Sequence, residues 1–125
     1  IAFAANFEMI LEMKIPNMGI GIDIVDIKRI KNDERFIDLI LSENEKKLLN
    51  SRFKKEEFLA GRFAAKEAFL KANHLGLGDI KLKDIEVFNL ENGQPIIIYD
   101  NKTFTEVSIS HEKEYAVAVV NIYDK

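Results

Sequence analysis

The stretch "GRFAAKEAFLKA", residues 61–72, is the feature that most restricts how this chain can fold. Its residues favour a helix, and large apolar side chains form two separate groups around that helix at about 100° per residue. A helix on the surface of a simple domain shows one apolar stripe opposite one polar face. The pattern therefore predicts a helix, over about Lys55 to Asn73, that other elements contact on several sides.

The charged residues of this stretch are predicted to lie in clefts. Arg62 and Lys66 fall in the gap between the two apolar groups, and Glu67 and Lys71 lie beyond the second group. Glu67 and Lys71 are also an i,i+4 pair in the favoured order, which would add only about 0.2–0.5 kcal/mol on an exposed surface. The helix alone leaves the cleft and the surface pair open as interpretations, and it assigns no role to Lys66.

The other predicted helices precede this one. Residues 28–41 mix charged and apolar side chains at helical spacing. The sequence "SENE" is a capping box, with Ser42 as N-cap and Glu45 at the third helical position, and it opens a short helix through about Asn50. The long helix is expected to end at the glycine pair at positions 76 and 78.

The strands are predicted at both ends of the chain. The segment "MGIGIDIVDI", residues 18–27, alternates as a strand does, and the last third contains two hairpins. Residues 85–90 and 95–99 flank Asn92-Gly93, a strong turn signal, and residues 106–110 and 115–122 flank "HEKE". This order predicts an α+β domain in which an antiparallel sheet packs against the long helix.

Length and composition exclude several classes of protein. The 125 residues suit one domain, and 18 basic against 21 acidic residues give a net charge of −3, so nothing indicates a nucleic acid or membrane partner. There is no cysteine, which excludes disulfides and thiolate sites and favours the cytoplasm. We predict an N-terminal extension over residues 1–17, native or added, and a single domain over residues 18–125.

Asp23 is an unusual residue for its place, because aspartate is disfavoured within a strand rich in isoleucine. Its neighbours on the same face are Gly19 and Gly21, which leave space for a ligand or for another backbone. A carboxylate there must be solvated, paired or bound to a cation. Together with Glu67 it would suit Mg²⁺, although nothing in the sequence places the two carboxylates close together. Asp26 is interpreted as a helix cap.

Two basic clusters and two histidines complete the candidate residues. Lys28, Arg29, Lys31 and Arg35 lie beside Phe36, and Arg52, Lys54 and Lys55 precede the long helix. Such clusters are often solvated surface, but in an acidic protein they would suit a phosphate-rich ligand and an acidic protein partner. His111 follows the strand segment "VSIS", whereas His74 is explained by the end of the long helix.

Three separated segments, in this order, resemble the signature blocks of the holo-[acyl-carrier-protein] synthases, the short AcpS-type 4'-phosphopantetheinyl transferases. They are "GIGIDIVDIKRI", "FLAGRFAAKEAFLKA" and "VSISHEKEYAVAVV", and the resemblance covers about residues 18–122. It implies the fold of that family and a Mg²⁺-dependent reaction. The 4'-phosphopantetheine of coenzyme A is moved to a serine of apo acyl carrier protein, with release of adenosine 3',5'-bisphosphate, in support of fatty acid biosynthesis.

The resemblance also implies roles for individual residues. Asp23 and Glu67 match the metal-binding carboxylates, Lys71 a lysine near the transferred phosphate, and His111 a histidine beside the coenzyme phosphates. These four are the predicted catalytic residues. The predicted coenzyme-binding residues are Arg62, Asn92, Gly93, Pro95, His111 and Lys54. Many relatives carry Lys or Arg where this chain has Gln94, which puts a charged contact from that position in doubt.

Partners are implied in the same way. Arg29, Arg35 and Phe36 match positions that dock the acidic helix of the carrier protein. Members of the family are typically homotrimers with the active site between subunits, which would explain a helix contacted on several sides. The alternatives are a non-catalytic module that binds coenzyme or carrier protein, and a small acidic interaction domain without a ligand.

Overall fold

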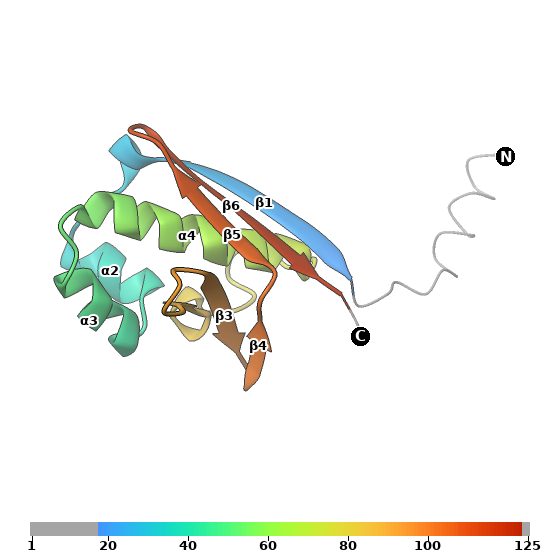
Figure 1. Ribbon diagram of the computed structural model, residues 1–125. Helices are drawn as coiled ribbons and strands as arrows, with labels where there is room; N and C mark the ends of the chain where they lie inside the picture. The colour runs from blue at the N-terminus through green and yellow to red at the C-terminus, as the bar shows by residue number, and fades with distance from the viewer. Residues whose placement is uncertain (1–17, 124–125) are drawn as a thin grey trace, which may run out of the picture.

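The computed structural model describes residues 18–123, so the predicted extension over residues 1–17 lies outside the described residues. The long helix α4 (Lys55–Ala72) runs through the middle of the domain (Figure 1). Three strands lie along one side of it: β1 (Gly19–Asp26), β5 (Val107–His111) and β6 (Tyr115–Ile122). They form an antiparallel sheet in the order β1-β6-β5.

The second sheet packs near the other side of α4, in the order β2-β3-β4. Its strands are β2 (Glu86–Asn89), β3 (Pro95–Tyr99) and β4 (Lys102–Phe104). The α+β class with antiparallel strands is confirmed, but the strands form two sheets where one was expected. Strand β4 was not predicted from the sequence, and it follows a tight turn with positive φ at Asp100 (50°) and Asn101 (61°). Two consecutive residues with positive φ are typical of a type I′ hairpin turn, and Asp and Asn tolerate that conformation.

The shorter helices are η1 (Ile27–Arg29), which directly follows β1, α2 (Glu34–Ile40), α3 (Glu43–Asn50) and η2 (Leu82–Asp84). Of these, α2 and α3 lie below α4 in Figure 1. The capping box at Ser42 and Glu45 is confirmed, and so is the cap at Asp26, whose Oδ1 accepts a hydrogen bond from the backbone N of Lys28. Residues 28–41 are helical only in part, because the side chain of Asp33 caps α2 and starts it at Glu34.

Helix α4 ends close to the predicted residue, but the residue in the left-handed conformation after it is a histidine and not one of the two glycines. The helix ends at Ala72, before the two glycines, and His74 takes the left-handed conformation with φ of 59°. The N–H of His74 donates to Lys71 O, and the N–H of Leu75 donates to Leu70 O. These two bonds form a Schellman motif that satisfies the last carbonyls of the helix without glycine.

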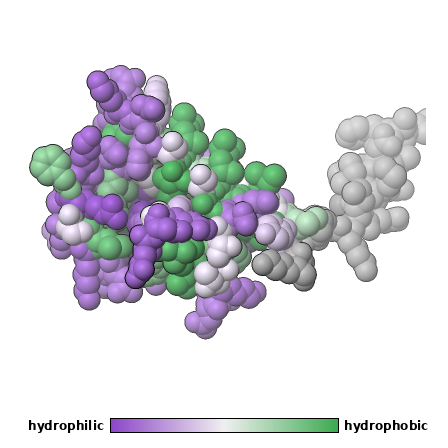
Figure 2. Space-filling model, viewed as in Figure 1, coloured by the Kyte–Doolittle hydropathy of each residue, from purple (hydrophilic) through white to green (hydrophobic). Residues whose placement is uncertain are grey.

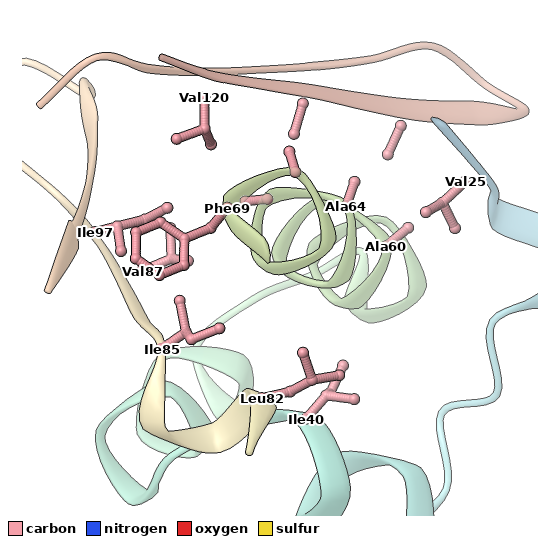
Figure 3. Packing of buried hydrophobic residues seen from close by; sticks show 14 of the residues in the cluster. Val25, Ile40, Ala60, Ala64, Phe69, Leu82, Ile85, Val87, Ile97 and Val120 are labelled. Carbon is pink, nitrogen blue, oxygen red and sulfur yellow. The ribbon is translucent and has the colours of Figure 1, made fainter. Parts of the chain in front are cut away.

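The hydrophobic core surrounds α4 on several sides, as its charge pattern predicts. Figure 3 shows Phe69 of the helix beside Ile97 of the second sheet, Val120 of the first sheet above the helix, and Ala60 and Ala64 on the side toward Val25. Below the helix in that view, Ile40, Leu82 and Ile85 are also buried. A helix enclosed in this way has no broad solvent-exposed face, so its charged side chains lie in separate gaps between the elements that pack on it.

The glycines of β1 allow the helix to lie directly against the strand. A Cβ atom at Gly21 would lie 1.7 Å from Ala68 O, and one at Gly19 would lie 1.9 Å from Ala72 O. The space above these glycines is therefore filled by another backbone, one of the two alternatives that the sequence left open. The opposite face of β1 carries Ile20, Ile22 and Ile24, whose side chains are 59–73% exposed.

Candidate functional site

Lys66, the one charge of the long helix without a predicted role, is fully buried and holds four segments together. Its Nζ donates to Ile40 O at the end of α2, to Leu82 O in η2 and to Glu45 Oε1 in α3. Glu45 in turn accepts from the N–H groups of Ser42 and Val87. Every contact is internal, so Lys66 supports the fold and does not belong to the site.

Asp23 and Glu67, by contrast, line one hollow of about 420 Å³, here called the carboxylate hollow. Its wall also includes Asp26 and the partner-binding candidates Arg29 and Phe36. Asp23 reaches it because Gly19 and Gly21 bring β1 against α4, the helix that carries Glu67. The structure thus brings together the two carboxylates whose proximity the sequence left undetermined.

The surroundings of Glu67 perturb its carboxylate. Burial raises the pKa of Glu67, the charge of Asp23 raises it further, and Lys71 acts in the opposite direction. The Oε1 atom of Glu67 is buried without a hydrogen-bond partner. A buried carboxylate oxygen without a partner is costly, and a bound cation would relieve that cost.

Lys71 lies beside Asp23. Its Nζ is 3.0 Å from Asp23 Oδ1 and 2.9 Å from Ile22 O. The Asp23 side chain is 16% exposed and the Lys71 side chain is 52% exposed. The ammonium group therefore neutralises Asp23 and remains accessible to an anionic ligand.

The donor set of the carboxylate hollow fits Mg²⁺. Within residues 18–123, no three His, Cys, Asp or Glu side chains are grouped so that they could hold a metal ion. Two carboxylates are enough for Mg²⁺, which keeps several waters and binds substrate phosphates in addition to one or two protein carboxylates. The partnerless Glu67 Oε1 beside Asp23 is consistent with that mode of binding.

A second hollow, of about 370 Å³, lies between the start of α4, the end of β5 and the turn that joins β2 to β3. We call it the hairpin hollow. Five of the predicted coenzyme-binding residues line it: Lys54, Arg62, Gly93, Pro95 and His111. Asn92 does not line it. Its Oδ1 accepts from Gln94 N and shapes the turn, while Gln94 Nε2 donates to Thr105 O.

Arg62 is held in this hollow by two neighbours. Its NH2 group donates to Asn89 Oδ1 at 2.7 Å, and its guanidinium lies 4.4 Å from the centre of the Phe58 ring. Burial lowers the pKa of Arg62 to about 10, so it stays cationic at neutral pH. Asn89 also donates to Gly93 O and so joins Arg62 to the turn. The sequence analysis missed Asn89, whose role depends on the pairing of β2 and β3.

His111 is oriented by Glu57, a second residue that the sequence analysis missed. The Nδ1 atom of His111 is 3.2 Å from Glu57 Oε1. An ionised carboxylate only accepts hydrogen bonds, so Nδ1 carries the proton in this contact and Nε2 remains for a ligand. A Cβ atom at Gly61 would lie 3.2 Å from His111 Nε2, so the glycine lets the imidazole lie close to α4.

The four predicted catalytic residues are not gathered in one hollow of a single chain. Asp23 and Glu67 line the carboxylate hollow, and Lys71 is bound to Asp23. His111 lines the hairpin hollow, and none of residues 18–123 lines both hollows. Arg35 is exposed on α2 and lines neither of the two hollows.

Among residues 18–123, no helix is long and apolar enough to cross a membrane.

The face of the molecule in Figure 2 is mostly hydrophilic, with hydrophobic side chains over the region of β1 and β6. The exposed apolar residues there are Ile20, Ile22, Ile24, Tyr115, Val119 and Tyr123.

Comparison with known families gives a match over residues 19–120 to the model of the 4'-phosphopantetheinyl transferase superfamily. A holo-[acyl-carrier-protein] synthase of Geobacillus sp. (strain WCH70) is 48% identical over 113 residues, which cover 84% of this chain and 95% of the relative. One from Oceanobacillus iheyensis is 46% identical over 82% of this chain and 92% of the relative.

Solved structures give the same result. The crystal structure of a holo-(acyl-carrier-protein) synthase from Bacillus anthracis, in complex with CoA (3',5'-ADP), is 45% identical. It matches with a TM-score of 0.74 over 82% of this chain and 93% of that chain. The Helicobacter pylori synthase in complex with coenzyme A is 33% identical, with a TM-score of 0.71 over 81% of this chain and 96% of that chain.

Proposed function

The chain belongs to the 4'-phosphopantetheinyl transferase superfamily, and on that premise we propose that it catalyses the reaction of a holo-[acyl-carrier-protein] synthase. It transfers the 4'-phosphopantetheine of coenzyme A to a serine of apo acyl carrier protein and releases adenosine 3',5'-bisphosphate. The match to the family model and the identity to the Geobacillus relative confirm the family resemblance of the three sequence segments. The observation in this chain that best supports the activity is that Asp23 and Glu67 line one hollow and that Lys71 is paired with Asp23.

In the reaction, the serine Oγ forms a bond to the phosphorus that carries the pantetheine arm. The bond from that phosphorus to the bridging oxygen of the pyrophosphate breaks, and the serine loses its proton. Such transfers depend on positioning and on neutralisation of charge more than on covalent help from the protein. Lys71 and His111 are the cationic or proton-bearing groups that would meet the charge that develops on the pyrophosphate.

Mg²⁺ is the proposed metal, held by Asp23 and Glu67. When bound, it would neutralise phosphate oxygens as a Lewis acid. The support is the buried Glu67 Oε1 that has no hydrogen-bond partner and the raised pKa of Glu67. Both features indicate that the negative charge of Glu67 is not balanced by hydrogen bonds or nearby cations in the free chain.

The hairpin hollow is the proposed site for the nucleotide end of the coenzyme. It is lined by the cations Arg52, Lys54 and Arg62, which suit phosphate groups, and by the imidazole of His111. At 370 Å³ it is at the small end of the range for ligand sites, so it would hold part of the coenzyme. The pantetheine end then extends toward the carboxylates.

We further propose that the chain acts as a homotrimer, with the coenzyme bound between neighbouring copies. Two observations support this. The predicted catalytic residues divide between two hollows of one chain, and the outer face of β1 exposes Ile20, Ile22 and Ile24. A row of exposed isoleucines is typical of a surface that another subunit covers. Sedimentation equilibrium tests this proposal, and a monomer at working concentration would contradict it.

The proposed carrier-protein surface consists of the basic residues Arg29 and Arg35 and the aromatic ring of Phe36. Arg29 and Phe36 line the carboxylate hollow, so a carrier protein bound there would present its serine beside Asp23 and Glu67. Action in the cytoplasm in support of fatty acid biosynthesis remains a prediction.

The decisive experiment mixes the protein with apo carrier protein, coenzyme A and Mg²⁺, and follows the carrier by mass spectrometry. The carrier protein should gain the mass of one phosphopantetheine, and EDTA should abolish the gain. Binding of coenzyme A without any mass gain would favour the non-catalytic binding module. Binding of neither coenzyme nor carrier protein would favour the interaction domain without a ligand.

A further inference from the structure

The hairpin hollow contains an aromatic ring that the fold does not use. Phe53 lines the hollow, yet its side chain is 99% exposed. The other phenylalanine of the hollow, Phe58, is only 6% exposed. Its ring is already contacted by the guanidinium groups of Arg52 at 5.0 Å and Arg62 at 4.4 Å. Of these two rings, Phe53 is therefore the one with free faces.

The backbone around Phe53 is anchored, so its position at the mouth of the hollow is defined. The N–H of Arg52 donates to Leu49 O at the end of α3. The Nζ of Lys55 donates to Leu49 O at 3.3 Å and to Arg52 O at 2.9 Å. The residues on both sides of Phe53 are thus tied to α3 and α4 while its ring points to solvent. An exposed ring adds nothing to the core, and both of its faces remain available to a ligand.

The surroundings of this ring indicate which ligand it suits. Arg52, Lys54 and Arg62 place positive charge around the hollow, and the carboxylate of Glu57, which also lines it, is paired with His111. Cations suit phosphate groups, and a free aromatic face suits the flat face of a nucleobase. A nucleoside bisphosphate carries both chemical groups in one molecule.

We propose that Phe53 stacks on the adenine ring of coenzyme A and is a further residue that binds the base of this substrate. The inference rests on the proposed function, since it assigns a residue to the coenzyme that the enzyme consumes. Stacking of a base on an aromatic side chain contributes about fivefold to 150-fold in affinity, as measured by substitution with alanine. It tolerates different bases, because every base has a π-face.

The absence of tryptophan from the chain allows a direct optical test. Phe53→Trp introduces a single indole at the mouth of the hairpin hollow. Adenosine 3',5'-bisphosphate should quench its fluorescence, and inorganic pyrophosphate, which has the charge but not the base, should not. The matched control is Leu39→Trp on α2, where the side chain is 66% exposed and outside both hollows. Its fluorescence should not respond to the nucleotide.

A binding measurement complements the optical test. Phe53→Leu keeps an apolar side chain and removes the ring. By calorimetry, we expect its Kd for adenosine 3',5'-bisphosphate to rise at least fivefold, the lower end of the stacking range. Its Kd for pyrophosphate and its thermal unfolding should not change, and Phe53→Trp should restore nucleotide affinity.

The outcomes separate this inference from the proposed function. If Phe53→Leu binds the nucleotide as tightly as the unaltered protein, or if the indole is not quenched at saturation, stacking is overturned. Continued transfer of phosphopantetheine in that case leaves the proposed function intact. If the unaltered protein binds no nucleotide and transfers nothing, both are overturned.

Discussion

The Nζ of Lys66 lies 2.6 Å from Oε1 of Glu45, and neither side chain is exposed to solvent. The pair joins the middle of α4 to the first turn of α3, and each partner also binds backbone groups of other segments. A buried ion pair adds little net stability over apolar residues of similar size, but removal of one partner leaves a buried charge without compensation. The pair is therefore a point at which single substitutions are much more harmful than paired ones.

We expect Lys66→Met to lower the free energy of unfolding by about 3–5 kcal/mol, because Glu45 and two backbone carbonyls lose their donor. Urea denaturation measures the change. The double variant Lys66→Met/Glu45→Gln should lose less than the sum of the single variants. Lys46→Met is the control, since Lys46 forms its pairs with Asp38 and Glu43 near the surface. Unaltered unfolding of Lys66→Met would contradict this account.

The close approach of β1 to α4 gives a second prediction. Gly21→Ala should destabilise the protein strongly, because the added Cβ would lie 1.7 Å from Ala68 O and the helix backbone cannot rotate away. Overpacking typically costs about 1–3 kcal/mol, and a clash with backbone should reach or exceed the upper end. Thermal unfolding measures the loss.

The matched control is Gly76→Ala. The nearest atom to a Cβ there is Asp79 Oδ2 at 3.8 Å, and the residue has no positive φ. The midpoint temperature of thermal unfolding of this variant should stay close to that of the unaltered protein. Equal midpoints for the two alanine variants would show that the strand and helix are not in the contact described.

Glu67 should destabilise the free protein and be needed for metal binding. Its folded-state pKa is raised, so folding favours the protonated form. The resulting stability is complete below the unfolded pKa of 4.5 and is lost as the pH rises through the folded-state pKa. At neutral pH, Glu67→Gln should therefore unfold at a higher temperature than the unaltered protein, and the difference should disappear at acid pH.

The same variant should lose most Mg²⁺-dependent turnover while keeping its fold. Thermal unfolding across pH, together with the transfer assay, tests both statements. Glu56→Gln, at an exposed position on the same helix, serves as the control. A Glu67→Gln variant that is less stable at neutral pH, or fully active, would contradict the assignment.

Lys71 should compete with the metal for Asp23. Its ammonium group already neutralises that carboxylate at 3.0 Å. Without coenzyme, Lys71→Gln should bind Mg²⁺ more tightly, because removal of the ammonium charge strengthens the attraction of Asp23 for a cation. Turnover should fall, because the same ammonium is lost from the phosphate. Calorimetric titration against the exposed-site control Lys47→Gln checks the first statement, and weaker Mg²⁺ binding would refute it.

Arg35 should contribute to carrier-protein affinity alone. It is exposed on α2 and lines neither hollow, so Arg35→Glu should weaken carrier-protein binding without change in the Kd for coenzyme A. The effect should shrink in high salt, because exposed charges are screened beyond about 10 Å at 0.1 M ionic strength. Surface plasmon resonance at two salt concentrations measures it. Equal losses for both ligands would indicate a damaged fold.

Local patterns in the sequence determined most of the elements, because caps, turns and periodicity act over a few residues. The capping box at Ser42, the hairpin at Asn92-Gly93 and the long helix were predictable for that reason. The family resemblance identified the chemistry and the residue types. The turn at Asp100 and Asn101 also has a local signal, two residues that tolerate positive φ, although β4 was not predicted from it.

Tertiary structure alone decided which charges meet. The sequence shows Lys66 and Glu67 as neighbours on one helix, yet one is buried in a structural ion pair and the other lines the carboxylate hollow. Their fates depend on what packs on each side of α4, and those contacts come from residues far away in the chain. Asn89 and Glu57 acquired their roles in the same way, because strand pairing and helix position bring them to Arg62 and His111.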